Sequence, residues 1–130
     1  LKYIEEYISK RKEIAELYRR ELTGVKGIRL LHDIKGVDHS YTYFPVFIDE
    51  KLYDESRDAL YERLKKNNIY GRRYFYPLIS QFPTYRGLPS AKPGNLLIAN
   101  SIAEQVICLP IYPDLDKMTI KRILNILINK

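Results

Sequence analysis

The feature that most restricts the fold of this sequence is a helical repeat of apolar residues at both of its ends. Over residues 2–22 apolar side chains recur mostly at steps of three and four, among charged residues. This pattern is typical of a long amphipathic helix. Over residues 120–127 apolar residues follow the i, i+3, i+4, i+7 spacing, behind Asp116 as a suitable N-cap. Because such a helix has to bury its apolar face, we expect the C-terminal helix to cover a sheet.

Short strands are predicted in the interior of the sequence. Residues 28–31 follow two glycines that end the first helix, and residues 41–48 are rich in aromatic and β-branched side chains. Pro45 has no backbone N–H to donate to a ladder, so it implies an edge strand or a bulge. Residues 69–76 are predicted as a third strand, and the apolar residues 106–109 as a buried fourth strand.

Two further helices are expected between these strands. Asp54 is a suitable N-cap for a helix that ends near residue 66, with Asn68 as its left-handed stop. A second helix, over about residues 95–105, has an apolar side made of Ile98, Ala99, Ile102 and Ala103. Residues 77–95 contain four prolines and two glycines, and we predict an extended loop that is too long to be a turn.

The resulting order of elements, αββαβαβα, predicts the α+β class, with a small and mostly antiparallel sheet packed against helices. We expect a single domain over residues 1–130, which is long enough to form a core without disulfides or metal. Neither a membrane-spanning run nor a signal peptide is indicated. Because the sequence begins at Leu1, already inside the amphipathic repeat, we expect a fragment of a longer protein.

Net charge and cysteine content indicate a kind of partner and a compartment, but they do not indicate the function. The net charge of +6 suggests an anionic partner, such as a nucleic acid, a phosphorylated metabolite or an acidic protein. Cys108 is the only cysteine, so no internal disulfide can form. It lies in an apolar run, where we expect a buried and inert thiol. A reducing, cytoplasmic setting fits best.

The densest group of candidate binding residues lies at the end of the predicted third strand. The group consists of Arg72, Arg73, Tyr74, Tyr76 and Gln81. Because side chains alternate along a strand, the even-numbered members at 72, 74 and 76 are expected on one side and Arg73 with Phe75 on the other. The first side can offer a guanidinium to phosphate oxygens and tyrosine rings to a sugar or base. The alternative is a solvated basic strand end whose tyrosines pack against helices.

Other reactive residue types give no specific signature. His32 and His39 flank a loop with Asp33 and Asp38, and such groups serve acid–base or metal chemistry. Their spacing matches no metal-binding pattern, so we predict no metal site and favour ordinary loop histidines. No sequence neighbour marks Ser80 as a nucleophile, and no glycine-rich loop opens a helix in the manner of a phosphate-binding motif.

Two segments of the second half carry a family resemblance. Residues 72–86 read RRYFYPLISQFPTYR, and residues 108–115 read CLPIYPDL. Weaker matches occur at Arg11 and Tyr18, at His39-Ser40-Tyr41, at Phe44-Pro45-Val46 and at Arg57-Asp58. On these residues the chain resembles, over essentially its whole length, the C-terminal domain of DegT/DnrJ/EryC1/StrS-type sugar aminotransferases.

The resemblance implies a fold, a reaction and different roles for the two domains of the parent enzyme. Members are fold-type I, pyridoxal-phosphate-dependent enzymes that move an amino group, usually from glutamate, onto a keto group of a nucleotide-linked sugar. Their products enter surface polysaccharides or antibiotics. The parent is expected to be a homodimer whose larger N-terminal domain, absent from residues 1–130, holds the cofactor lysine. The fragment is therefore expected to contain no catalytic residue, to bind no cofactor and to be inactive alone.

The resemblance also implies a role for the candidate binding residues. In the family, the segment that matches residues 72–81 borders the active-site cleft and helps to hold the nucleotide sugar. We carry that substrate-binding role to Arg72, Arg73, Tyr74, Tyr76 and Gln81. Many relatives have a histidine where this sequence has Ile79, so a contact made by that histidine is lost or replaced. The segment FYPLIS resembles enzymes that act on dTDP-linked 4-keto-6-deoxy sugars.

Two other classes of function stay open on the sequence alone. One is a basic module that binds single-stranded nucleic acid through Arg72, Arg73 and exposed tyrosines, with an affinity that falls steeply with salt. The other is a freestanding interaction domain that recruits a partner through an apolar face. Neither of these functions requires the N-terminal domain that the family resemblance implies.

Overall fold

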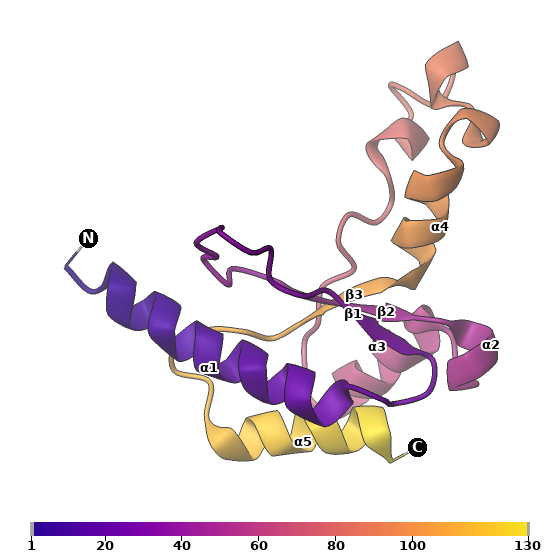
Figure 1. Ribbon diagram of the computed structural model, residues 1–130. Helices are drawn as coiled ribbons and strands as arrows, with labels where there is room; N and C mark the ends of the chain where they lie inside the picture. Colours follow the sequence, from indigo (N-terminus) through magenta and orange to yellow (C-terminus); the bar gives the residue numbers. More distant parts are fainter. Residues whose placement is uncertain (1, 130) are drawn as a thin grey trace.

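The computed structural model describes residues 2–129 and has a three-stranded antiparallel sheet with strand order β1-β2-β3 (Figure 1). Leu1, on which the expectation of a fragment rests, lies outside the described residues. The elements in chain order are α1 (Ile4–Leu22), β1 (Ile28–Leu30), β2 (Phe44–Ile48), α2 (Glu50–Tyr53), α3 (Arg57–Lys66), the short 3₁₀ turns η1 (Ile79–Gln81), η2 (Pro89–Ala91) and η3 (Pro93–Asn95), α4 (Leu97–Gln105), β3 (Val106–Leu109) and α5 (Lys117–Ile128). The predicted α+β class with a small antiparallel sheet is confirmed.

The core lies between the sheet and the helices α1, α3 and α5. Helices α1 and α5 lie side by side below the sheet, and α3 contacts both α5 and β3 (Figure 1). The predicted apolar stripe of α5 is buried, at Ile120, Ile123, Leu124 and Leu127. Tyr18 of α1 is fully buried, and its hydroxyl donates a hydrogen bond to the carbonyl oxygen of Pro110 at 2.9 Å. Burial raises the pKa of Tyr18, so this hydroxyl stays protonated.

Pro45 lies in the central strand, so the prediction of an edge strand or a bulge is wrong. It pairs with Cys108 of β3, whose backbone N–H and C=O are both bonded to Arg72 on the other side. The N position of Pro45 therefore faces the β1 side, where β1 has already ended at Leu30, the partner of Val46. The proline is tolerated because no strand is present to receive the hydrogen bond that it cannot donate.

The helical region around residue 54 differs from the prediction in its caps. Asp54 is not an N-cap: with φ of 61° it closes the one-turn helix α2, which the sequence analysis missed. The N-cap of α3 is Ser56, whose side chain accepts a hydrogen bond from the backbone N–H of Ala59. Asn68 has φ of 58°, as predicted for a left-handed stop.

Residues 69–76 do not form the predicted strand. A single isolated bridge joins Arg72 to Cys108, and the chain then turns, with the N–H of Tyr76 donating to the carbonyl oxygen of Arg73 at 3.1 Å. The expected alternation of side chains is therefore wrong as well. The physical reason is that a strand needs a continuous partner, and here one residue alone pairs with β3.

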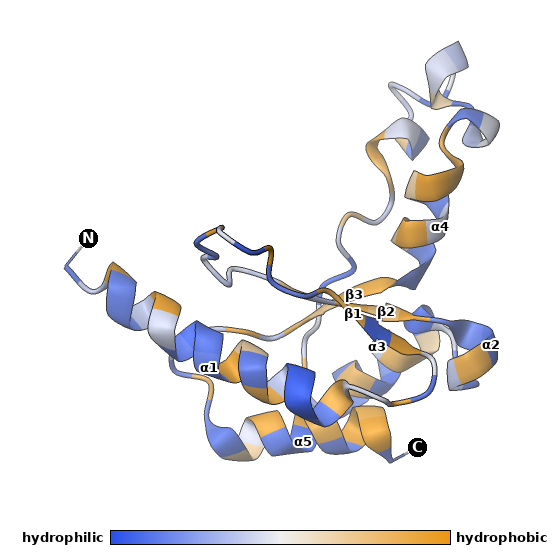
Figure 2. Cartoon of the chain, viewed as in Figure 1, coloured by the Kyte–Doolittle hydropathy of each residue, from blue (hydrophilic) through white to orange (hydrophobic). Residues whose placement is uncertain are grey.

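The proline-rich segment and the start of α4 form an arm, defined here as residues 77–101, that extends away from the sheet (Figure 1). The predicted loop is folded into the three short turns η1, η2 and η3. Helix α4 was predicted correctly, but its apolar side is mostly open to solvent. Ala103 is buried, whereas Leu97 and Ile98 are 71% and 81% exposed, and Figure 2 shows the hydrophobic colour on this helix.

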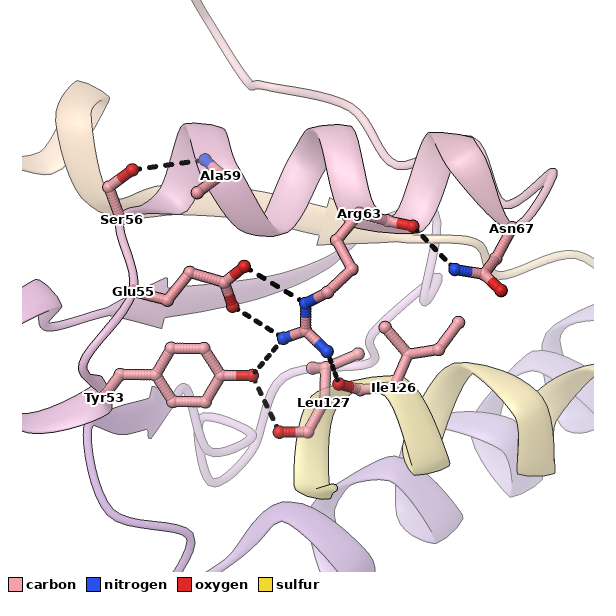
Figure 3. A network of polar contacts seen from close by, with 8 residues as sticks. All are labelled: Tyr53, Glu55, Ser56, Ala59, Arg63, Asn67, Ile126 and Leu127. Carbon is pink, nitrogen blue, oxygen red and sulfur yellow. Dashed lines mark hydrogen bonds and ion pairs between the residues drawn. The ribbon is translucent and has the colours of Figure 1, made fainter. Parts of the chain in front are cut away.

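Arg63 is the centre of a polar network that joins α3 to the last turn of α5 (Figure 3). Its guanidinium donates to both carboxylate oxygens of Glu55, at 3.1 and 2.6 Å, and to the carbonyl oxygen of Ile126. The Tyr53 hydroxyl donates to the carbonyl oxygen of Leu127 at 2.7 Å. Because the last carbonyls of a helix lack intrahelical partners and carry partial negative charge, these donors stabilise the end of α5.

We expect Arg63→Ala to lower the free energy of unfolding by about 2 kcal/mol, because Glu55 and the α5 carbonyl then lose a charged donor. The side chains of Arg63 and Glu55 are only 27% and 18% exposed, so solvent screens the pair weakly. Arg20→Ala is the control, because the Arg20 side chain is 71% exposed and pairs with the adjacent Glu21. Its expected loss is below about 0.5 kcal/mol. Urea denaturation measures both, and equal losses would contradict the network's role.

Candidate functional site

The predicted binding residues border two neighbouring hollows that share the side chain of Tyr76. One hollow, of about 490 Å³, is lined by Arg72, Arg73, Tyr74 and Tyr76. The other, of about 680 Å³, lies between the first turns of α2 and α3 and helix α4, and it is lined by Tyr76 and Gln81. The structure thus brings four of the five residues around one hollow. Gln81 is placed at the second hollow, across the ring of Tyr76.

Arg72 has the only guanidinium of the predicted group that is left available to a ligand. Its backbone is fixed, because its N–H and C=O both bond Cys108, at 2.9 and 2.8 Å. Its side chain is exposed, and within residues 2–129 no hydrogen bond or ion pair engages it. It also borders a third hollow, of about 340 Å³, together with Tyr43 and Tyr112. A free guanidinium on a fixed backbone can form paired hydrogen bonds with phosphate oxygens.

Arg73, in contrast, is engaged by neighbouring side chains. Its Nη1 donates to Asp58 Oδ1 at 3.2 Å. Its guanidinium carbon also lies 4.6 Å from the ring centroid of Tyr61 and 4.9 Å from that of Tyr76. These distances are typical of cation–π contacts. Arg73 therefore lines the hollow with a guanidinium that Asp58 and two tyrosine rings already engage.

Arg57 is a residue at this site that the analysis of single residues missed. It is only 2% exposed, its Nη1 donates to the carbonyl oxygen of Val106 at 2.8 Å, and its guanidinium carbon lies 4.9 Å from the ring centroid of Tyr76. Its Nε lies 2.8 Å from Asp58 Oδ1 in an ion pair without hydrogen-bond alignment. The sequence pattern of the helix did not indicate that Arg57 is buried, because an arginine in the first turn of an amphipathic helix is expected in solvent. Arg57-Asp58 stood out only as part of the family resemblance.

The remaining two residues of the group are ordered by local contacts. The Tyr74 ring packs between those of Tyr43 and Phe75, with centroid distances of 4.6 and 4.0 Å. Gln81 Oε1 accepts a hydrogen bond from the backbone N–H of Leu78 at 3.3 Å, which closes the first turn of the arm. Its Nε2 lies 3.5 Å from Asn100 Oδ1 of α4. Gln81 thus links the beginning of the arm to its end.

The histidine loop carries no metal site within the part of the chain that the structure describes. His39 Nε2 accepts a hydrogen bond from the backbone N–H of Ile34 at 2.9 Å, which is a structural role. Asp33 is bonded by Arg19 and by the Tyr41 hydroxyl. Burial opposes ionisation of Asp33, but these hydrogen bonds hold the pKa of its carboxyl below the usual range. His39 thus has a structural contact in this loop, and ordinary loop histidines stay the prediction.

Neither the cysteine nor the lysines of the described residues offer a nucleophile. Cys108 is buried as predicted, and burial raises the pKa of its thiol to about 11. Between residues 2 and 129 every lysine is exposed or half-buried. A lysine that forms an imine with a cofactor aldehyde has to be held unprotonated in a desolvated pocket. No lysine of the described residues therefore meets the requirement for an imine with pyridoxal phosphate. Within the same residues, no helix is long and apolar enough to span a membrane.

Comparison with known proteins decides the family. The family model described as "DegT/DnrJ/EryC1/StrS aminotransferase family" matches residues 1–128. The chain belongs to this family. The resemblance drawn from residues 72–86 and 108–115 is thereby confirmed, and the match covers residues 1–128 rather than these two segments alone.

The relatives within the DegT/DnrJ/EryC1/StrS family are longer proteins. The chain is 52% identical over 130 residues to dTDP-4-amino-4,6-dideoxy-D-glucose transaminase of Escherichia coli, covering 100% of the chain and 35% of that relative. It is 30% identical over 125 residues to the transaminase of the same name from Shigella dysenteriae, covering 96% and 33%. The solved structure of S. venezuelae DesV in complex with a ketimine intermediate has a TM-score of 0.83 and 26% identity, covering 98% and 32%. The chain therefore spans about a third of the length of these relatives.

Proposed function

We propose that this chain is the C-terminal small domain of a pyridoxal-phosphate-dependent sugar aminotransferase of fold type I. The substrate in this proposal is a nucleotide-linked keto-deoxy sugar, a dTDP-linked 4-keto-6-deoxy sugar in the first instance. The observation that carries the proposal is the 52% identity over the whole chain to a transaminase named for a dTDP-linked 4-amino-4,6-dideoxy sugar. The product would serve surface polysaccharide biosynthesis, and the enzyme would act in the cytoplasm.

The reactive group lies outside residues 1–130 in this proposal. When bound, pyridoxal phosphate supplies the electron sink that lets an amino group move between two carbon skeletons. Its lysine would belong to a preceding N-terminal domain, because the lysines of the described residues are all in contact with solvent. The parent enzyme would be a homodimer with glutamate as the amino donor. The part described here would then form one wall of the cleft and be inactive alone.

Within that wall, the binding residues have different tasks. Arg72 is proposed to pair with the diphosphate of the nucleotide, because its guanidinium is exposed and unengaged. Tyr76, 45% exposed between the two larger hollows, would pack against the sugar or base, and Gln81 would offer its amide beside it. Tyr74 and Arg73 complete the wall. The exposed apolar residues of the arm, such as Ile79 at 62%, would then face the rest of the enzyme.

The nucleic-acid hypothesis receives less support from the geometry. It requires Arg72 and Arg73 to present their charges together to phosphates. Arg73 is instead paired with Asp58 and packed on two tyrosine rings. Binding of single-stranded nucleic acid needs several phosphate contacts, and one free arginine supplies too few of them.

The proposal is tested on the longer protein that carries this chain. We expect that protein, supplied with pyridoxal phosphate, glutamate and dTDP-4-keto-6-deoxyglucose, to form an amino sugar that mass spectrometry detects. Residues 1–130 alone should form none under the same conditions. Amination by the isolated chain would contradict the division of labour, and failure of the longer protein with every nucleotide-linked keto sugar tried would contradict the function.

A further inference from the structure

Two arginines converge on one tyrosine at the root of the arm. The guanidinium carbons of Arg57 and Arg73 each lie 4.9 Å from the ring centroid of Tyr76. The backbone N–H of Tyr76 also donates to the carbonyl oxygen of Arg73 at 3.1 Å. Tyr76 is the last residue before the arm begins at residue 77. The conformation of this one residue therefore sets the direction in which the arm leaves the domain.

A single carboxylate holds the two arginines together. Asp58 Oδ1 lies 2.8 Å from Arg57 Nε and 3.2 Å from Arg73 Nη1. Two cations beside one ring repel each other, and Arg57 is only 2% exposed, so water cannot screen its charge. The carboxylate between them, on a side chain that is 51% exposed, offsets this repulsion. The side chain of Arg73 is 33% exposed and can leave the ring, whereas the buried Arg57 is also tied to Val106.

We propose that Asp58 is a positioning residue for the substrate wall. By pairing with Arg57 and Arg73 it clamps Tyr76, and the clamp fixes the arm so that Tyr76 and Gln81 meet the nucleotide sugar at the two hollows. Asp58 itself touches no reacting atom in this account. The inference rests on the proposed function for its substrate, but the clamp is a property of the chain and can be measured without substrate.

The first measurement is hydrogen–deuterium exchange on the 130-residue chain. Asp58→Asn keeps the size of the side chain and removes its charge, so Arg73 should leave Tyr76. We expect amides of residues 76–81 to exchange about ten-fold faster, with little change in α5. Arg73→Gln should give the same increase, and the double variant should exchange no faster than either single variant, because both remove one clamp. Glu62→Gln is the control, since Glu62 is exposed on the same helix.

The second measurement is kinetic and uses the longer protein. Asp58→Asn should raise KM for the nucleotide sugar about ten-fold while kcat changes less than about two-fold, because binding is misplaced and the chemistry is untouched. Glu62→Gln should leave both constants as they are. A purely structural role for Asp58 would instead lower the amount of active enzyme without moving KM.

The outcomes separate the clamp from the proposed function. Exchange of residues 76–81 within two-fold of the unmodified chain in both Asp58→Asn and Arg73→Gln would overturn the clamp, as would an equal increase in Glu62→Gln. If Asp58→Asn unfolds the chain, exchange rises in α5 as well, and Arg73→Gln then decides the matter. A longer protein that aminates no nucleotide sugar, in which these variants still free the arm, would refute the function and leave the clamp standing.

Discussion

Gly27→Ala is expected to lower the free energy of unfolding by about 4 kcal/mol, from a combination of backbone strain and steric overlap. Gly27 has φ of +81°, a region that alanine enters only at a cost of about 1–2 kcal/mol. A Cβ at this position would also lie 2.2 Å from the backbone nitrogen of Tyr53, which belongs to α2 and cannot swing away as a side chain could. The carbonyl oxygen of Gly27 accepts the N–H of Asp49, so the overlap falls where β1 is joined to the start of α2.

Gly24→Ala separates the two causes. Gly24 has a similar φ of +86°, but a Cβ there would meet nothing within 4 Å. We expect a loss of about 1 kcal/mol from strain alone. Urea denaturation of the two variants, followed by circular dichroism, gives the difference directly. Losses of the same size would show that the backbone of Tyr53 does not approach Gly27 closely.

Arg72→Ala is expected to lower kcat/KM for the nucleotide sugar about 100-fold in the longer protein, because a charged hydrogen-bond pair to the diphosphate is lost. The fold should tolerate the change. The bridge to Cys108 uses only the backbone of Arg72, and its exposed side chain makes no hydrogen bond or ion pair with the rest of residues 2–129. The expected change in unfolding free energy is below about 0.5 kcal/mol.

The control for Arg72→Ala is Arg20→Ala, which removes the same charge from an exposed position on α1. It should leave kcat/KM within about two-fold of the unmodified protein if the effect at residue 72 is local, and it reports any effect of net charge on the approach of an anion. A loss below five-fold for Arg72→Ala, or an equal loss for Arg20→Ala, would remove Arg72 from the substrate site.

Elements with strong internal periodicity could be predicted from the sequence. The stripe of α5 and the left-handed Asn68 depend on local chemistry that a few neighbouring residues encode. The absence of a strand at residues 69–76 could not be predicted from the sequence. The aromatic and β-branched residues of this segment satisfy the strand preference, but only Arg72 finds a partner on β3. The prediction of an edge strand or a bulge at Pro45 follows from a sound local rule, that proline has no backbone N–H to donate. The position of the end of β1, which makes it acceptable in the centre, is a tertiary property.

The candidate site was predictable as a segment but not as an arrangement. The resemblance located residues 72–81, and the structure places them at the surface around hollows. The resemblance did not indicate that Arg73 turns toward Asp58 while Arg72 stays free. The different directions of these two side chains depend on the chain turn at Tyr76. The buried Arg57 was missed for the opposite reason. Its environment is made by β3 and Tyr76, which are distant in sequence from α3.

The central claim, that residues 1–130 shape the substrate wall while the cofactor is held elsewhere in the same enzyme, is tested most directly by locating the cofactor lysine. The longer protein is loaded with pyridoxal phosphate and reduced with borohydride, which converts the imine into a stable secondary amine, and its peptides are mapped by mass spectrometry. The account predicts one pyridoxyl-lysine, in the segment that precedes residue 1. A pyridoxyl-lysine at a single defined position within residues 1–130 would contradict it.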